Sequence, residues 1–160
     1  MPISERLVDG DRMREFANEI IHNRALQAGI LSWFVAQLLK IVFDFLTTQR
    51  IDIKRFIASG GMPSSHSAFA CGLSCAIGLI DGFNSSSFAI SLTFTLIVMY
   101  DAAGVRREAG KQAQTLNELI EIYFSPHYKP QYKLKELIGH KPTEVFAGAV
   151  LGILIAILLI

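Results

Sequence analysis

The sequence predicts an all-α membrane protein, a polytopic helix bundle of about four transmembrane helices with one additional interfacial helix. Of its 160 residues, 51% are hydrophobic and the mean hydropathy is +0.39, which exceeds what a soluble core of this size needs. Four apolar stretches approach the length of a membrane span, and polar or turn residues bound each of them. We expect one membrane domain over residues 1–160, with a polar N-terminal segment at 1–24.

The four predicted spans are residues 25–48, 64–80, 88–103 and 143–160. The first of them carries Gln37, Lys40 and Asp44, so one of its faces must look into protein or water and not into lipid. The second follows a Gly-Gly-Met-Pro sequence at 60–63, whose proline suits a first helical turn.

A polar loop at 105–142 separates the third and fourth spans. Apolar residues recur in it at helical spacing beside charged ones, which predicts an amphipathic helix at the membrane interface. These apolar residues are Ala109, Ala113, Leu116, Leu119 and Ile120. Ser125 and Pro126 interrupt the pattern and predict the end of this helix.

The charge balance excludes one large class of partners. A formal charge of +1 and a pI near 7.8, without a basic run interleaved with aromatic residues, argue against nucleic-acid binding. The two cysteines, Cys71 and Cys75, lie four apart in an apolar stretch, as small apolar residues of one helix face do.

The loop lysines and arginines predict the orientation in the membrane. With four spans, two basic loops share one side, while the turn at 81–87 and the segment ending at Ile160 carry no lysine or arginine. The basic residues are Arg50, Lys54, Arg55, Arg106, Arg107, Lys111, Lys129, Lys133, Lys135 and Lys141. The positive-inside rule therefore predicts an integral protein of the cell membrane whose basic side faces the cytoplasm.

Three polar clusters lie where the predicted spans meet this basic side. The first is Lys40 within a span, with Arg50 just beyond it. The second is a glycine-rich turn that opens a helix with Ser64, Ser65 and His66. Backbone N–H groups at a helix N-terminus, two hydroxyls and an imidazole together favour binding of an anion such as phosphate.

The third cluster is a histidine and a carboxylate at the start of the last span. His140 and Glu144 are four residues apart, so the carboxylate can accept one ring N–H of the histidine. The other ring nitrogen would then be free as a nucleophile or base. A simple helix-capping contact explains the pair equally well.

The order of these clusters resembles a known family. Lys and Arg, then Pro-Ser-Ser-His, then Gly-His followed by Glu-Val and a glycine-spaced helix are similar to the type 2 phosphatidic acid phosphatase superfamily, which includes the vanadium haloperoxidases. The resemblance covers roughly residues 37–152. It implies that His140 is the nucleophile, Glu144 its orienting carboxylate and His66 the general acid.

The resemblance also implies a phosphate pocket and one displaced residue. Lys40, Arg50, Ser64 and Ser65 would hold the phosphate. In the family, a further arginine lies at the end of the helix that precedes the helix of the nucleophile. This chain has polar residues at that place, which we interpret as the replacement. They include Asp101, a possible orienting residue, followed by Arg106 and Arg107, which would bind phosphate.

These residue types suit a lipid phosphatase or isoprenoid diphosphatase that needs no metal or other cofactor, since lysine and arginine supply the positive charge. Its partners would be the bilayer and a phosphorylated lipid or isoprenoid. A second hypothesis is a non-catalytic binder or carrier of such lipids. A third is a metal site built from His66, His140, Glu144 and Asp101.

Overall fold

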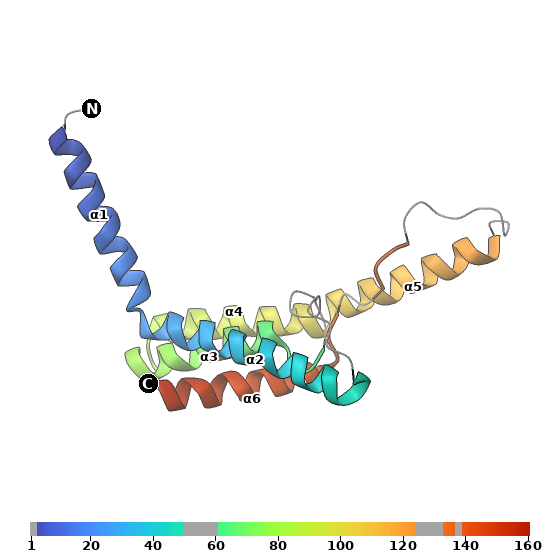
Figure 1. The fold of residues 1–160 in the computed structure, drawn as a ribbon. Coiled ribbons are helices and arrows are strands. Elements are labelled where there is room, and N and C mark those ends of the chain that lie inside the picture. Colours follow the sequence, from blue (N-terminus) through green and yellow to red (C-terminus); the bar gives the residue numbers. More distant parts are fainter. Residues whose placement is uncertain (1–2, 50–60, 124–132, 137–138) are drawn as a thin grey trace.

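A computed structural model describes residues 3–49, 61–123, 133–136 and 139–160, and it is helical throughout its regular parts (Figure 1). The helices in chain order are α1 (Ile3–Ile21), α2 (Arg24–Thr48), α3 (Ser65–Asp81), α4 (Ser86–Ala103), α5 (Val105–Tyr123) and α6 (Pro142–Leu159). Side-chain oxygens of Asn23, Ser64 and Ser85 cap α2, α3 and α4, so the breaks in the apolar pattern are also the starts of these helices.

Four of these helices form the bundle, and α3 lies at its centre. Helices α2, α4 and α6 each pack against α3, as Figure 1 shows. The buried face of α3 is made of small residues: Ser65, Ser67, Ala68, Ala70, Cys71, Gly72, Ser74, Ala76 and Gly78. Small side chains let three neighbours approach one helix closely, as is common in membrane bundles. The predicted all-α bundle is confirmed.

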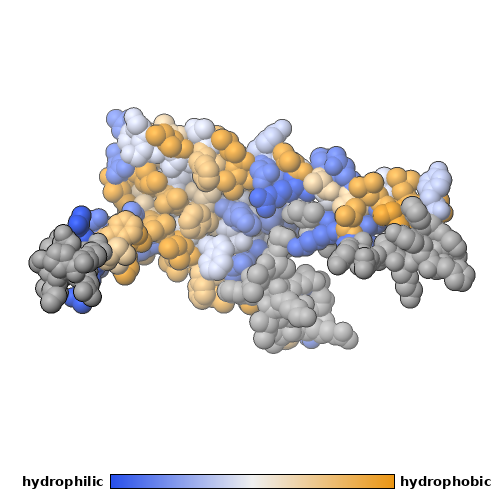
Figure 2. Space-filling model, turned by 90° about the horizontal axis from the view of Figure 1, so that it is seen from above, coloured by the Kyte–Doolittle hydropathy of each residue, from blue (hydrophilic) through white to orange (hydrophobic). Residues whose placement is uncertain are grey.

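The bundle is built to lie in a membrane. Within the described residues, α2, the continuous α4–α5 pair and α6 are each long and apolar enough to cross one. Helix α3, with 17 residues, is about 25 Å long and is enclosed by the other three. Large apolar side chains cover much of the outer surface of the bundle (Figure 2). The chain is therefore an integral membrane protein.

Two glycines of α6 determine how closely α6 packs against α3. A Cβ atom on Gly148 would collide with the carbonyl oxygen of Ser64, and one on Gly152 with the carbonyl oxygen of Ala68. In addition, the Ser64 N–H donates to the carbonyl oxygen of Glu144 across a 2.9 Å distance. The N-terminal ends of α3 and α6 are thus held backbone to backbone at one end of the bundle.

The opposite end of the bundle is closed by Arg24. Its guanidinium donates to the carbonyl oxygens of Leu159 and Ile160 at 2.9 and 3.1 Å. The start of α2 therefore lies beside the end of α6, and both lie near the turn between α3 and α4 (Figure 1). This arrangement places the predicted polar clusters together at the other end.

Two helices extend beyond the bundle (Figure 1). The expected amphipathic helix is α5, which continues from α4 at Gly104, while the predicted break at Ser125 and Pro126 lies outside the described residues. Helix α1 was not predicted, because its composition is polar. The exposed Met13, Phe16 and Ile20 recur on one face of it, which is the helical signal in this segment.

Candidate anion-binding site

Lys40 of α2 turns into the bundle. Its side chain is only 6% exposed, and Nζ donates to Ser65 Oγ across 3.1 Å. The side chain therefore points to the start of α3. A buried lysine is costly in a membrane unless it is paired or bound. The position of Lys40 therefore indicates that its ammonium group serves contacts within the site.

The N-terminus of α3 supplies hydroxyls and backbone donors beside Lys40. Ser64 is fully buried and caps the helix, since its Oγ accepts hydrogen bonds from the N–H of Ser67 at 3.4 Å and from Ser67 Oγ at 3.1 Å. Ser65 is 3% exposed and carries the contact to Lys40. Of the two serines predicted to hold phosphate, Ser64 has a capping role and Ser65 faces the lysine.

His140 reaches the same place from the segment before α6. Its backbone N–H donates to the carbonyl oxygen of Ala102 at 3.0 Å, which fixes it against the end of α4. Its ring centroid lies 6.0 Å from that of His66, with the two planes 77° apart. His66 is exposed, whereas His140 is 3% exposed. One small anion can therefore be reached by both rings.

The imidazole of His140 is buried and has no hydrogen-bond partner among the described residues, at either Nδ1 or Nε2. Unpartnered buried polar groups are rare in proteins and mark sites that bind something. Burial, together with the positive charge of Lys40 and the nearby His66 and Arg106, lowers the pKa of His140 to about 4. The ring is therefore neutral at physiological pH, as a nucleophilic histidine must be.

Glu144 does not make the ring contact expected from its spacing to His140. Its Oε2 accepts the backbone N–H of Lys141 at 3.1 Å, and its own N–H donates to the carbonyl oxygen of Lys141 at 2.9 Å. The carboxylate satisfies orphan donors at the start of α6, where it also opposes the positive end of the helix dipole. Of the two readings of this spacing, the capping contact is the one that forms. Glu144 thus bonds to the backbone of Lys141, the residue next to His140, and not to the imidazole of His140.

The displaced arginine is better matched by Arg106 than by Arg107. Arg106 Nε donates to Asp101 Oδ2 at 2.6 Å, and its charge acts on both histidine rings. Both arginines are exposed, and the backbone of Arg107 lies against Gly139. Asp101, predicted as an orienting residue, orients this arginine. Arg50, the remaining predicted phosphate ligand, lies outside the described residues.

Two further residues hold segments after α5 against that helix. The side-chain amide of Asn117 donates to the carbonyl oxygen of Leu134 at 2.9 Å and accepts its N–H at 3.1 Å, which ties the chain to α5. A Cβ on Gly139 would collide with the backbone of Arg107, so this glycine is needed for close contact with α5. Neither residue has a catalytic side chain. The Gly-His sequence was a signal for Gly139, and no sequence signal pointed to Asn117.

The alternative metal site does not form. Within the parts of the chain that the structure describes, no three His, Cys, Asp or Glu side chains lie close enough together to hold a metal ion. His66 and His140 face each other, but Glu144 caps α6 and Asp101 is paired with Arg106. The site is a cluster of two histidines with Lys40, Ser65 and Arg106.

A helical bundle with such a cluster where its helix ends meet defines an integral membrane protein with a candidate anion-binding site. The chain matches the Divergent PAP2 family over residues 21–155, and it belongs to that family. It is 38% identical to the uncharacterized membrane protein YuiD of Bacillus subtilis (strain 168), over 88% of this chain and 96% of that protein. No solved structure is significantly similar to it.

The buried position of His140 predicts an unusual titration. In a protein labelled with ¹³C at histidine Cε1, the resonance that His140→Gln removes should keep its neutral chemical shift until the pH falls to about 4. The cause is burial beside Lys40, which opposes protonation. His22→Gln, at the other end of the bundle, is the control for assignment. A midpoint for His140 near its ordinary value of 6.5 would contradict this geometry.

Proposed function

We propose that the protein is a membrane phosphatase that removes phosphate from a lipid phosphate or an isoprenoid diphosphate. The observation that carries the proposal is the meeting of buried Lys40, Ser65 and His140 with His66 at the joined ends of α3 and α6. Membership of the Divergent PAP2 family supports it. A site at the end of a membrane bundle suits a substrate whose head group is charged and whose tail remains in lipid.

The proposed reaction passes through a covalent intermediate on His140. A neutral ring nitrogen forms a bond to phosphorus while the bond from phosphorus to the leaving oxygen breaks, and protonated His66 gives its proton to that oxygen. Water then attacks the phosphohistidine, the phosphorus–nitrogen bond breaks, and His66 takes the proton of the water. Lys40 and Arg106 stabilise the charge that builds up on the phosphoryl oxygens.

The second candidate function is binding or carriage of a phosphorylated lipid without turnover. One observation favours it: the ring of His140 lacks a carboxylate partner, because Glu144 caps α6 instead. A histidine nucleophile without an orienting partner loses part of its catalytic advantage, whereas an anion pocket needs none. Phosphate release from phosphatidate, phosphatidylglycerophosphate and prenyl diphosphates by the purified protein separates the two functions.

We expect His140→Ala to abolish phosphate release, since the covalent bond to phosphorus is assigned to His140 and no other residue of the segment that opens α6 can form it. His66→Ala should lower kcat for an alkyl phosphate by roughly 10²–10⁴-fold and for an activated aryl phosphate far less, because a good leaving group needs no proton. The control is His22→Ala, whose ring bonds to the carbonyl oxygen of Asn18 away from the site. Equal losses with both substrates would remove His66 as the acid.

We further propose that the pocket opens to the cytoplasm. The site end of the bundle carries Arg106 and Arg107 at the start of α5 and Lys141 before α6, whereas the turn between α3 and α4 carries no lysine or arginine. Arg24 at the opposite end is engaged with the C-terminal carbonyls of α6.

This orientation is testable by labelling intact cells with a membrane-impermeant thiol reagent. In a background with Cys71→Ala and Cys75→Ala, Ser86→Cys should be labelled and Lys133→Cys should not, because only the first faces outward. Both positions are exposed in the folded protein, and lysis of the cells before labelling provides the control. The opposite pattern would place the pocket on the outer face.

A further inference from the structure

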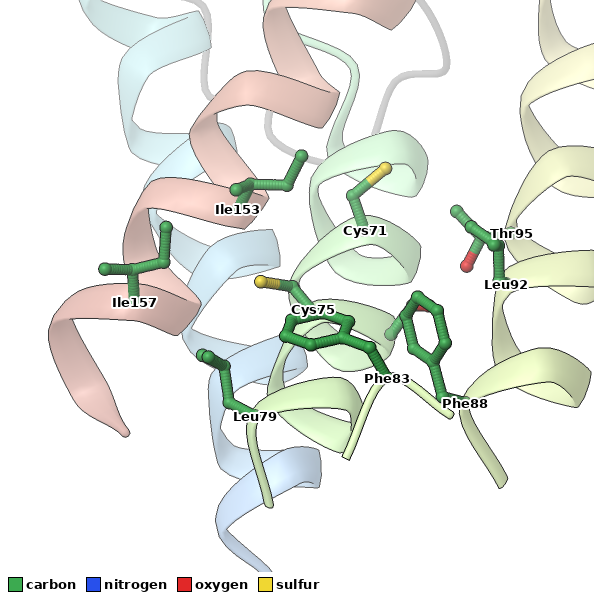
Figure 3. A pocket seen from close by; sticks show the side chains of 10 residues that line it. Cys71, Cys75, Leu79, Phe83, Phe88, Leu92, Thr95, Ile153 and Ile157 are labelled. Atoms are coloured by element: carbon green, nitrogen blue, oxygen red, sulfur yellow. The ribbon is translucent and has the colours of Figure 1, made fainter. Parts of the chain in front are cut away.

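An apolar cavity of about 350 Å³ lies between α3, α4 and α6, within the membrane part of the bundle. Figure 3 shows that its lining comes from these helices and from the turn that joins α3 to α4. The lining residues are Cys71, Ser74, Cys75, Leu79, Phe83, Phe88, Leu92, Thr95, Ile153 and Ile157. Its volume is in the range of ligand pockets. Helices α4 and α6 have few contacts with each other, so α3 forms the floor between them.

The few polar groups of the lining are already bonded within the protein. Thr95 Oγ1 donates to the carbonyl oxygen of Ala70 at 3.0 Å, and the hydroxyls of Ser74 and Ser91 are 3.1 Å apart. Cys71 Sγ donates to Met99 Sδ at 3.5 Å. Apart from the weakly polar Cys75 thiol, the side-chain polar groups of the lining are engaged, so hydrocarbon is the matching occupant.

The cavity and the histidine site both lie along α3, at different depths of the bundle. Ser65 and Cys71 are six residues apart on α3, so the cavity begins about 9 Å below the pocket, and it ends at Leu79, about 21 Å below it. Half of the hydrocarbon core of a bilayer measures about 15 Å. An occupant attached to a head group in the pocket must therefore pass the bilayer midplane to fill the cavity.

Two aromatic rings close the far end. The rings of Phe83 and Phe88 meet edge to face, with centroids 5.1 Å apart, and the Phe83 ring rests against Gly78 of α3. Figure 3 shows both rings across the end of the cavity that lies beside Leu79. Such a barrier limits how far a chain can extend.

We propose that this cavity binds one hydrocarbon chain of the phosphorylated lipid, and that Phe83 and Phe88 set the longest chain that fits. The inference rests on the proposed function only in that the phosphate occupies the histidine site.

The cavity position specifies the substrate class as a lipid whose chain passes the bilayer midplane. A long prenyl chain meets this requirement, whereas a short prenyl chain or one confined to a single leaflet does not.

Photo-crosslinking measures this occupancy without requiring turnover. The probes are a long-chain prenyl phosphate and the matching prenyl alcohol, each with a diazirine at the chain end, added to the full-length protein in vesicles. We expect the phosphate probe to label the lining residues at least tenfold more than the alcohol does, since the head group holds the chain in place. Equal labelling by both probes would mean that bulk lipid fills the cavity, and would overturn the proposal.

Substitutions on the same helix provide matched controls. Ile153→Trp fills the cavity and should remove at least nine-tenths of the labelling, whereas Leu154→Trp, which is exposed and does not line the cavity, should leave it unchanged. Phe83→Ala removes a ring that is 59% exposed and should shift the best-binding chain to a longer prenyl phosphate. An unchanged chain-length preference in Phe83→Ala would overturn the role of the phenylalanines. This test holds even if the Ile153→Trp variant does not fold.

The labelling result is independent of catalysis. If the phosphate probe labels the cavity while no phosphate is released from any substrate, the chain site stands and the phosphatase proposal fails. If phosphate is released but release and labelling are independent of chain length, the phosphatase stands and the chain site fails.

Discussion

The close packing of α3 against α6 is the constraint on which the rest of the structure depends. Gly148 and Gly152 have no side chain, so the backbone of α6 lies directly against the carbonyl oxygens of Ser64 and Ala68. Both helices begin at the same end of the bundle, with His66 in the first turn of α3 and His140 just before α6. The catalytic geometry that we propose therefore follows from a packing contact: two helix starts that meet also bring together two helix dipoles, which favour an anion.

The electrostatics of the pocket follow from its burial. Lys40 is directed inward to Ser65 although it sits in a membrane helix, and its charge helps to keep the neighbouring His140 neutral. A neutral histidine beside fixed cations is suited to attack phosphorus in an anionic group. The same buried charges would hold a phosphate that is bound but never cleaved, which is why binding and catalysis share one site in both candidate functions.

The sequence predicted the elements with strong local signals and missed those that depend on contacts between distant residues. Apolar length and breakers such as Pro63 located the bundle helices, and the Ser-Ser-His and Gly-His sequences located the pocket. Spacing could not decide the partner of Glu144, because the orphan N–H groups of α6 compete with the imidazole for its carboxylate. Nor could it identify Asn117, since its partner Leu134 lies 17 residues away across a fold-dependent contact.

The most direct test of the account is whether an anion binds at the joined ends of α3 and α6. Orthovanadate, a phosphate analogue, can be titrated into histidine-labelled protein while the Cε1 resonances of His66 and His140 are followed. We predict that both resonances shift together with one dissociation constant, and that Gly148→Ala, which forces the two backbones apart, weakens that binding at least tenfold. Vanadate that leaves either resonance unmoved, or that binds Gly148→Ala as tightly as the unaltered protein, would contradict the account.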